Sequence, residues 1–186
     1  MKVGIKNQIY VVTGGPGFGK STLINYLEQL GYSVGHEVAR EIIREQRSKG
    51  GNVLPDKDIC SFQQEVLKRR LAFYNSVEKD EVVFSDRAIP DQIAFARYRG
   101  FDTPDILIDN ARKVRYNEMV FITPPWQEIY KNDMVRSESF EKACELHQII
   151  FNVYREFDYL PVEIPCLGIK QRVDFILNLI NKKNGF

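Results

Sequence analysis

The chain has 186 residues, with 26 Lys and Arg against 25 Asp and Glu, a formal net charge of +1, and 44% apolar residues. This length suits one compact domain, residues 1–186, and the composition is that of an ordinary globular protein. A dedicated nucleic-acid binder would carry a basic excess and a disordered chain would carry few apolar residues, so both classes are disfavoured.

Short apolar runs alternate with longer helical stretches along the whole chain. In chain order, the pattern predicts a strand at 9–12, a helix at 20–30, a strand at 32–37, helices at 38–48 and 55–78, a strand at 82–84, helices at 90–99 and 104–114, a strand at 119–123, a helix at 140–157, a strand at 162–165 and a helix at 171–181. Five strands separated by helices predict an α/β fold of three layers, in which helices cover both faces of a parallel sheet. Ligands of such sheets bind at the carboxyl ends of the strands.

Cysteine usage and hydropathy indicate a cytoplasmic protein. The three cysteines, Cys60, Cys144 and Cys166, lie far apart in the sequence, and their odd number favours reduced, mostly buried thiols. Neither of the two histidines belongs to a set of Cys and His residues with the complete spacing of a structural zinc site. The apolar run at 9–12 is too short for a transmembrane segment or a signal peptide.

The first predicted strand is followed by a complete phosphate-binding motif. Residues 14–22 read Gly-Gly-Pro-Gly-Phe-Gly-Lys-Ser-Thr and match G-x-x-x-x-G-K-[ST]. Glycines allow positive φ, so successive N–H groups can face a phosphate at a helix N-terminus. The predicted nucleotide-binding residues are Gly14, Gly15, Gly17, Phe18, Gly19, Lys20, Ser21 and Thr22. We expect Lys20 to reach the β- and γ-phosphates of ATP and the Ser21 hydroxyl to hold Mg²⁺.

The residues that end the third predicted strand favour phosphoryl transfer over hydrolysis. The D-x-x-G and N-K-x-D motifs of switch GTPases are both absent from the sequence. Asp86 can hold the Mg²⁺ shell, whereas Arg87 places a positive charge where many ATPases carry a hydrolytic glutamate. Because phosphoryl transfer depends mainly on positioning and charge neutralisation, this pair suits transfer to a bound acceptor. Asp91 follows Arg87 by four residues and can form an ion pair that fixes it.

Glu37, at the end of the second predicted strand, is a candidate for orienting the acceptor hydroxyl. It can equally be an acid that stabilises a helix N-terminus and pairs with Arg40, and Asp86 is a competing base. The acceptor pocket is expected between the second and third strands and the helix at 55–78. On that helix, Phe62-Gln63-Gln64 can stack against a planar ring, although aromatic residues at helical spacing are more often part of the core.

A polar segment before the helix at 140–157 predicts a lid at about residues 127–140. Arg136 in this segment is the candidate phosphate clamp, because arginine presents a planar fork to phosphate; the alternative is a solvated surface charge. Trp126, the one tryptophan, is expected to pack at the hinge of the lid. The predicted catalytic residues are therefore Lys20, Glu37, Asp86, Arg87 and Arg136, and the predicted Mg²⁺ ligands are Ser21 and Asp86.

Several stretches together resemble a known family over most of the chain. They are Thr13–Gly17 with Lys20–Thr22, Glu37–Ile43, Asp86-Arg87 with Pro90-Asp91, Pro124-Pro125-Trp126 with Ile129-Tyr130, Asp133 and Arg136, and Arg172–Ile176. The chain resembles the AAA-type P-loop domain shared by the nicotinamide-riboside kinase part of a bacterial regulator of NAD biosynthesis and by TRPL-translocation-defect proteins. The resemblance implies a nucleoside-kinase-like fold with strand order 2-3-1-4-5, with ATP and Mg²⁺ as ligands. It also implies that Glu37 is the strand-end acid and Asp86-Arg87 the acid–arginine pair of such kinases.

The leading hypothesis is an ATP-dependent kinase that phosphorylates a small, nucleoside-like metabolite. The alternative is a nucleotide-dependent binding module, in which ATP or GTP controls association with a protein or lipid, as in other members of the resembled family. The expected partners are a nucleoside triphosphate and a small-molecule acceptor, without nucleic acid. An oligomer is compatible with either hypothesis.

Overall fold

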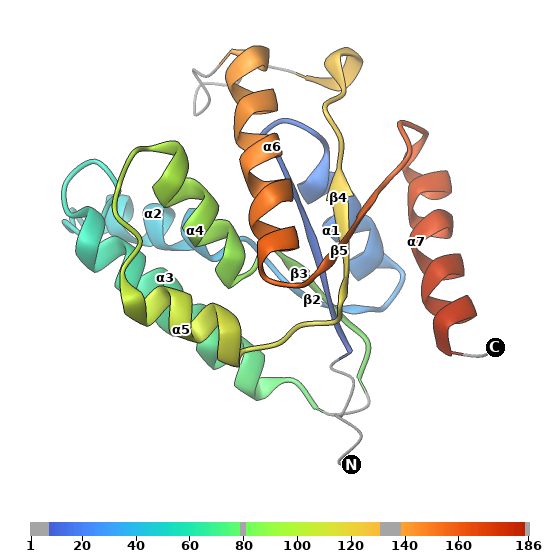
Figure 1. The fold of residues 1–186 in the computed structure, drawn as a ribbon, viewed down its shortest axis with the longest axis horizontal. Coiled ribbons are helices and arrows are strands. Elements are labelled where there is room, and N and C mark those ends of the chain that lie inside the picture. Colours follow the sequence, from blue (N-terminus) through green and yellow to red (C-terminus); the bar gives the residue numbers. More distant parts are fainter. Residues whose placement is uncertain (1–7, 79–80, 131–138, 185–186) are drawn as a thin grey trace.

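The structure is a computed structural model that describes residues 8–78, 81–130 and 139–184 (Figure 1). Its strands are β1 (Ile9–Gly14), β2 (Ser33–Gly35), β3 (Val83–Asp86), β4 (Met119–Thr123) and β5 (Leu160–Glu163). Its helices are α1 (Lys20–Gln29), α2 (Val38–Ser48), α3 (Ile59–Ser76), α4 (Ile89–Tyr98), α5 (Asp105–Lys113), α6 (Phe140–Glu156) and α7 (Ile169–Asn184), with a short 3-10 helix η1 (Gln127–Ile129). Among the described helices, none is long and apolar enough to cross a membrane.

The five strands form one parallel sheet with the order β2-β3-β1-β4-β5, which confirms the predicted topology. The central strand β1 is buried along its whole length, between β3 and β4. Val12 of β1 is in register with Asp86 of β3 and Phe121 of β4. The carboxyl ends of β1 and β3 therefore lie at the same edge of the sheet, where the chain enters the phosphate-binding motif and reaches Asp86.

Helices cover both faces of the sheet, as Figure 1 shows. Alternate side chains of β1 point to opposite faces. Tyr10 and Val12 pack in one core cluster with α1 and α7, whereas Ile9 and Val11 pack in another with α4, α5 and α6. The alternation of the sequence between strand and helix therefore produces the three predicted layers.

Several predicted boundaries differ from those of the structure. The helix predicted from residue 55 begins at Ile59, because the Asp58 side chain accepts a hydrogen bond of 3.0 Å from the Ser61 N–H and caps it there. The last strand covers Leu160–Glu163 rather than 162–165, since the Leu160 N–H already donates to the Glu118 carbonyl oxygen at 2.7 Å. The expectation of mostly buried thiols is wrong: Cys60 near the start of α3 and Cys166 in the loop after β5 are both exposed.

Candidate active site

The phosphate-binding motif forms the turn between β1 and α1, and its glycines have the geometry that the motif requires. Gly14, Gly17 and Gly19 all have positive φ, of 128°, 79° and 79°. A Cβ atom at Gly14 would lie 2.5 Å from the carbonyl oxygen of Thr123, so the close approach of β1 to β4 also demands glycine there. The loop thus leaves the buried strand and enters α1 at Lys20.

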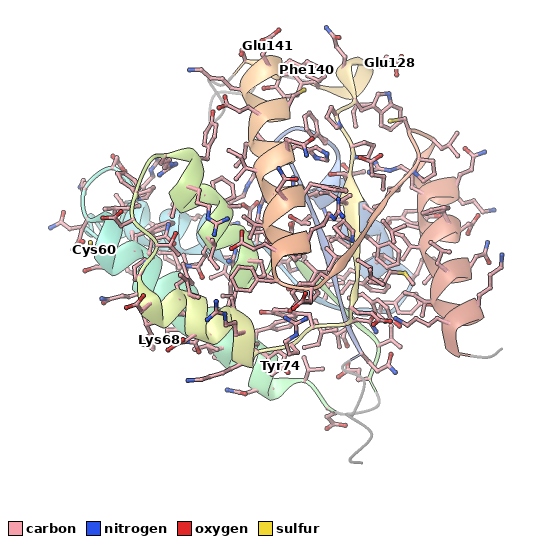
Figure 2. The ribbon with its side chains drawn as sticks, viewed as in Figure 1. Cys60, Lys68, Tyr74, Glu128, Phe140 and Glu141 are labelled. Carbon is pink, nitrogen blue, oxygen red and sulfur yellow. The ribbon has the colours of Figure 1, made fainter. Side chains whose placement is uncertain are left out.

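The Phe18 side chain turns away from this loop into the protein interior. It is completely buried and packs against Tyr130, Phe140 and His147, with ring centroids 5.9–6.1 Å apart. Figure 2 labels Phe140 at the start of α6, near the same end of the molecule as Glu128 in η1. Only the backbone of Phe18 is therefore available to a phosphate, whereas its ring anchors the loop to α6.

Lys20 is folded back onto its own loop. Its side chain is 6% exposed, and its Nζ donates a hydrogen bond of 2.6 Å to the Gly15 carbonyl oxygen. Burial, followed by repulsion from Arg87, lowers the pKa of Lys20 to about 7. A phosphate group near this amine would supply the negative charge that favours the protonated form.

Arg87 is the residue at which the parts of the site meet. It is 4% exposed and adopts a φ of 70°, which is uncommon for a residue with a side chain. Its Nη1 donates to Asp91 Oδ1 at 2.9 Å and to the Gly14 carbonyl oxygen at 3.2 Å, and its Nε donates to Glu37 Oε1 at 3.3 Å. These contacts tie α4, the phosphate loop and the start of α2 to one guanidinium, and they confirm the predicted Arg87–Asp91 ion pair.

The Asp91 carboxylate is fully buried and accepts four hydrogen bonds. Oδ1 accepts from the Thr13 hydroxyl at 2.5 Å and from Arg87, and Oδ2 accepts from the Ala88 N–H at 2.9 Å and from the Tyr154 hydroxyl at 2.5 Å. Burial would raise the pKa of Asp91, but the charges of Arg87 and Arg70 and the hydrogen bonds from Thr13 and Tyr154 outweigh it and hold the pKa below its usual value. These hydrogen bonds fix the Asp91 carboxylate, which in turn fixes the Arg87 guanidinium.

Glu37 has the structural role that the sequence allowed, as an acid at the start of α2 that pairs with Arg40, and its part in orienting an acceptor stays a prediction. It is the N-cap residue of α2, and its Oε2 accepts from Arg40 Nε at 2.8 Å while Oε1 faces Arg87. Although burial acts in the opposite direction, Arg87 and Arg40 hold the pKa of Glu37 below its ordinary value. The side chain is thus an ionised carboxylate that lies beside the phosphate loop.

Asp86 has the properties of a metal-shell carboxylate. It is buried, and within the described part of the chain its Oδ1 has no hydrogen-bond partner. Burial, followed by repulsion from Glu37, raises the pKa of Asp86 to about 6. Among residues 8–78, 81–130 and 139–184, no three His, Cys, Asp or Glu side chains gather to hold a metal by themselves. Mg²⁺ characteristically takes one or two protein oxygens together with substrate phosphates, so Asp86 and the exposed Ser21 fit that ion.

A cavity of about 430 Å³ runs along the phosphate loop. Its lining residues are Pro16, Gly17, Gly19–Thr22, Glu37, Arg40, Arg87, Trp126, Ile129, Leu167–Ile169 and Arg172. Glu37 and Arg87 belong to this lining, and so does Arg172, whose guanidinium lies 5.7 Å from the centroid of the Trp126 ring. Sequence reasoning assigned no role to Arg172, because only the packing of α7 beside α1 brings it to Gly19.

A second cavity, of about 260 Å³, lies between β2, β3, α2 and α3. This is the location that the sequence predicts for the acceptor pocket. Among the described residues, Arg87 alone lines both cavities. Phe62 is not part of it: its side chain is buried in a cluster with Ile42 and Val66, as a core residue.

The structure does not place every predicted residue. Arg136 and the central part of the predicted lid, residues 131–138, lie outside the described residues. Lys20, Glu37, Asp86 and Arg87 are brought together at the carboxyl edge of β1 and β3. Ser21 and Thr22 line the first cavity with Lys20, Glu37 and Arg87, whereas Asp86 lines the second.

The sequence profile of a family described as an AAA domain matches residues 9–172. The chain belongs to this family. A comparison with curated protein sequences finds no match.

Solved structures of several kinases are similar to this chain in fold. Deoxyadenosine kinase from M. mycoides, solved with products bound, has a TM-score of 0.66 and 20% identity, and the match covers 94% of this chain and 99% of that chain. Thymidylate kinase from Candida albicans has a TM-score of 0.64 and 13% identity, with 96% and 93% covered. NadR protein in complex with NR has a TM-score of 0.67 and 18% identity, and the match covers 97% of this chain and 52% of that one. At these identities the likeness shows the fold alone.

Proposed function

We propose that this protein is an ATP- and Mg²⁺-dependent kinase that transfers the γ-phosphoryl group to a small, nucleoside-like acceptor. The observation that carries the proposal is the convergence of Lys20, Glu37, Asp86 and Arg87 between two cavities. A nucleotide-controlled binding module needs the first cavity, but it has no use for a second polar cavity that adjoins the γ-phosphate position.

The proposed reaction moves the γ-phosphoryl group of ATP to an oxygen of the acceptor. The bond between the γ-phosphorus and the oxygen that bridges it to ADP breaks, and a bond from the γ-phosphorus to the acceptor oxygen forms. Glu37, ionised between two arginines, orients the acceptor hydroxyl and receives its proton. Lys20 and Arg87 neutralise charge on the transferring group. Ser21 and Asp86 would hold Mg²⁺, which would further neutralise the charge on the phosphate oxygens.

Arg136 stays a predicted clamp on the phosphates, since its arginine chemistry suits that role. Support for a nucleoside-like acceptor comes from the resembled fold, since the kinases of similar structure are named for deoxyadenosine and thymidylate and NadR was solved with NR. Proteins of the same fold can act on different substrates, so the acceptor class needs a direct test.

The test is ADP release from ATP and Mg²⁺, measured with a panel of nucleosides, nucleoside monophosphates and small hydroxy acids. We expect at least one acceptor to raise ADP release well above the rate of enzyme alone. Glu37→Gln should lower kcat while nucleotide binding persists, and Lys20→Ala should abolish both. Lys68→Ala, at a side chain on α3 that is 79% exposed, is the matched control and should behave as the wild type (Figure 2).

If no acceptor raises ADP release, the kinase proposal is wrong. Nucleotide-dependent association with a protein or an acidic vesicle in that case would favour the binding module instead. Unchanged ATP binding by Lys20→Ala, measured by calorimetry, would contradict the phosphate-site assignment itself.

A further inference from the structure

The cavity between β2, β3, α2 and α3 has walls of charged side chains and contains no residue of the phosphate loop. Its lining residues are Val34–His36, Val38, Glu41, Arg69, Arg70, Phe73, Ser85–Arg87 and Tyr116. Because Arg87 also lines the nucleotide cavity, a molecule in this space lies next to the position of the transferring phosphoryl group. The volume of about 260 Å³ is below the range of roughly 300–1,000 Å³ for drug-sized ligands, so it suits a small metabolite or part of one.

Arg70 of α3 is a buried cation in the wall of this cavity. Its side chain is 6% exposed, and Nη1 donates to the Ala88 carbonyl oxygen. Within residues 8–78, 81–130 and 139–184, no carboxylate oxygen lies within 4.0 Å of its guanidinium, and its one hydrogen bond is to the Ala88 carbonyl oxygen. The positive charge of Arg70 is thus removed from water without a direct counter-ion.

The neighbouring arginines differ sharply from Arg70. Arg69, the preceding residue, donates to both oxygens of Glu45, at 2.8 and 2.7 Å, and to Glu65 at 2.8 Å. Arg87 is paired with Glu37 and Asp91. Arg69 and Arg87 are therefore paired with carboxylates, whereas Arg70 is not.

Asp86 and Glu41 line the cavity together with Arg70, but among the described residues no oxygen of either lies within 4.0 Å of its guanidinium. Asp91 accepts four hydrogen bonds, and the two oxygens of Glu37 face Arg40 and Arg87 separately. A buried charge is strongly unfavourable unless it is paired. The planar fork of arginine matches the two oxygens of a carboxylate or phosphate.

From these contacts we infer that the acceptor carries a carboxylate or phosphate group, which enters this cavity and pairs with Arg70. This inference rests on the proposed kinase function and narrows it, because it selects anionic acceptors over their neutral counterparts. The anionic group is a recognition element at some distance from the acceptor oxygen, so Arg70 acts on binding and leaves the chemical step to Lys20, Glu37, Asp86 and Arg87.

The experiment compares acceptors in pairs that differ in one anionic group. The pairs are a nucleoside with its 3′-monophosphate, which keeps the 5′-hydroxyl, the same nucleoside with its 5′-monophosphate, and quinic acid with methyl quinate. The two phosphate pairs and the acid–ester pair distinguish phosphate from carboxylate recognition. We expect the wild type to have a higher kcat/KM for the anionic member of at least one pair.

Arg70→Met should lower kcat/KM for that anionic acceptor by roughly 10- to 100-fold, mostly through KM, and should leave the neutral member nearly unchanged. Arg70→Lys keeps the charge and should restore part of the preference. Arg97→Met removes an arginine that pairs with Glu156 on the surface, and should alter neither member. Binding of ATP, followed by the fluorescence of Trp126, checks that each variant is folded.

Three outcomes are separable. Selective loss of the anionic acceptor in Arg70→Met supports the inference. The inference is wrong if neutral acceptors are turned over at least as fast as anionic ones and Arg70→Met has no selective effect. The proposed kinase function is unaffected by that result. No turnover with any member of any pair overturns the kinase function and the inference together.

Discussion

Arg87 is held in position by Asp91, which lines neither of the two cavities. Asp91 lies behind it, fully buried, and holds the guanidinium while Thr13 and Tyr154 saturate the remaining oxygen positions. A cation fixed in this way needs little reorganisation when charge develops on a phosphoryl group. The same arrangement makes the fold sensitive to the loss of either charge, because the other charge remains buried.

Asp91→Asn should therefore reduce the free energy of unfolding by about 3–5 kcal/mol, as for other buried ion pairs that lose one partner. Tyr154→Phe removes one donor and keeps the carboxylate, so its cost should be smaller, about 1–3 kcal/mol. Denaturant unfolding of both variants measures the difference. Equal losses would show that the Arg87–Asp91 charge pair contributes nothing beyond one hydrogen bond.

Lys20 should make nucleotide binding dependent on pH. In the free protein its pKa is about 7, whereas a bound phosphate favours the protonated amine. Above pH 7 binding must therefore take up a proton, and affinity should fall by up to about tenfold per pH unit between pH 7 and 9. Calorimetric titration of ATP across this range measures the effect.

Lys20→Arg provides the control for this pH dependence, because arginine keeps its charge throughout the range. Its ATP affinity, even if lower, should stay constant from pH 7 to 9. A wild-type affinity that is equally constant would mean that the Lys20 amine is already charged in the free protein.

At the scale of elements, the connection from β1 to α1 is fixed by backbone geometry as much as by side chains. Gly14 combines a φ of 128° with contact to β4, since a Cβ there would meet the carbonyl oxygen and Oγ1 of Thr123, both at 2.5 Å. The carboxyl end of β1 is thereby held against β4 while the loop turns toward Arg87, whose Nη1 bonds the Gly14 carbonyl oxygen.

Gly14→Ala should destabilise the protein more than Gly31→Ala. Gly31 also has a positive φ, of 92°, but a Cβ there would meet no atom within 4 Å among those described. Gly31→Ala therefore measures the backbone strain alone, about 1–2 kcal/mol, and the excess for Gly14→Ala measures the clash with β4. Similar losses in thermal unfolding would argue against close packing at Gly14.

Sequence patterns predict elements well where the signal is local. The motif at residues 14–22, the strand β1 and the Arg87–Asp91 pair depend on spacing of a few residues, and the structure shows that strand and that pair. Arg70 and Arg172 gave no such signal, because their surroundings come from segments far away in the sequence. The predicted start of α3 was wrong for a different reason: Pro55 suggested an earlier start, but Asp58 caps the helix, which begins at Ile59.

For the whole molecule, the alternation of strands and helices sufficed to predict the parallel sheet, and the resemblance to a family implied its order. Burial of both faces follows from apolar strands that are continuous rather than alternating. The acceptor could not be predicted, since its cavity is formed by residues of β2, β3, α2 and α3 that have no common spacing.

Nucleotide binding should stabilise the whole domain. A ligand at 100 times its Kd adds about 2.7 kcal/mol to the free energy of unfolding, which for a domain of this size corresponds to a rise of roughly 5–10 °C in Tm. Thermal unfolding with and without ATP and Mg²⁺ measures the shift. Lys20→Ala should show almost none, and an unchanged wild-type Tm would contradict the phosphate site.

The three-residue strand β2 lies at the edge of the sheet and pairs with β3 alone, whereas β1, β3 and β4 form its centre. Residues of this edge strand, α2 and α3 form most of the walls of the smaller cavity, whereas the phosphate loop directly follows the central strand β1. Replacements in β2, α2 or α3 leave the register of β1 with its neighbours untouched. Homologous proteins can therefore diverge in the molecule they modify while they inherit the nucleotide machinery unaltered.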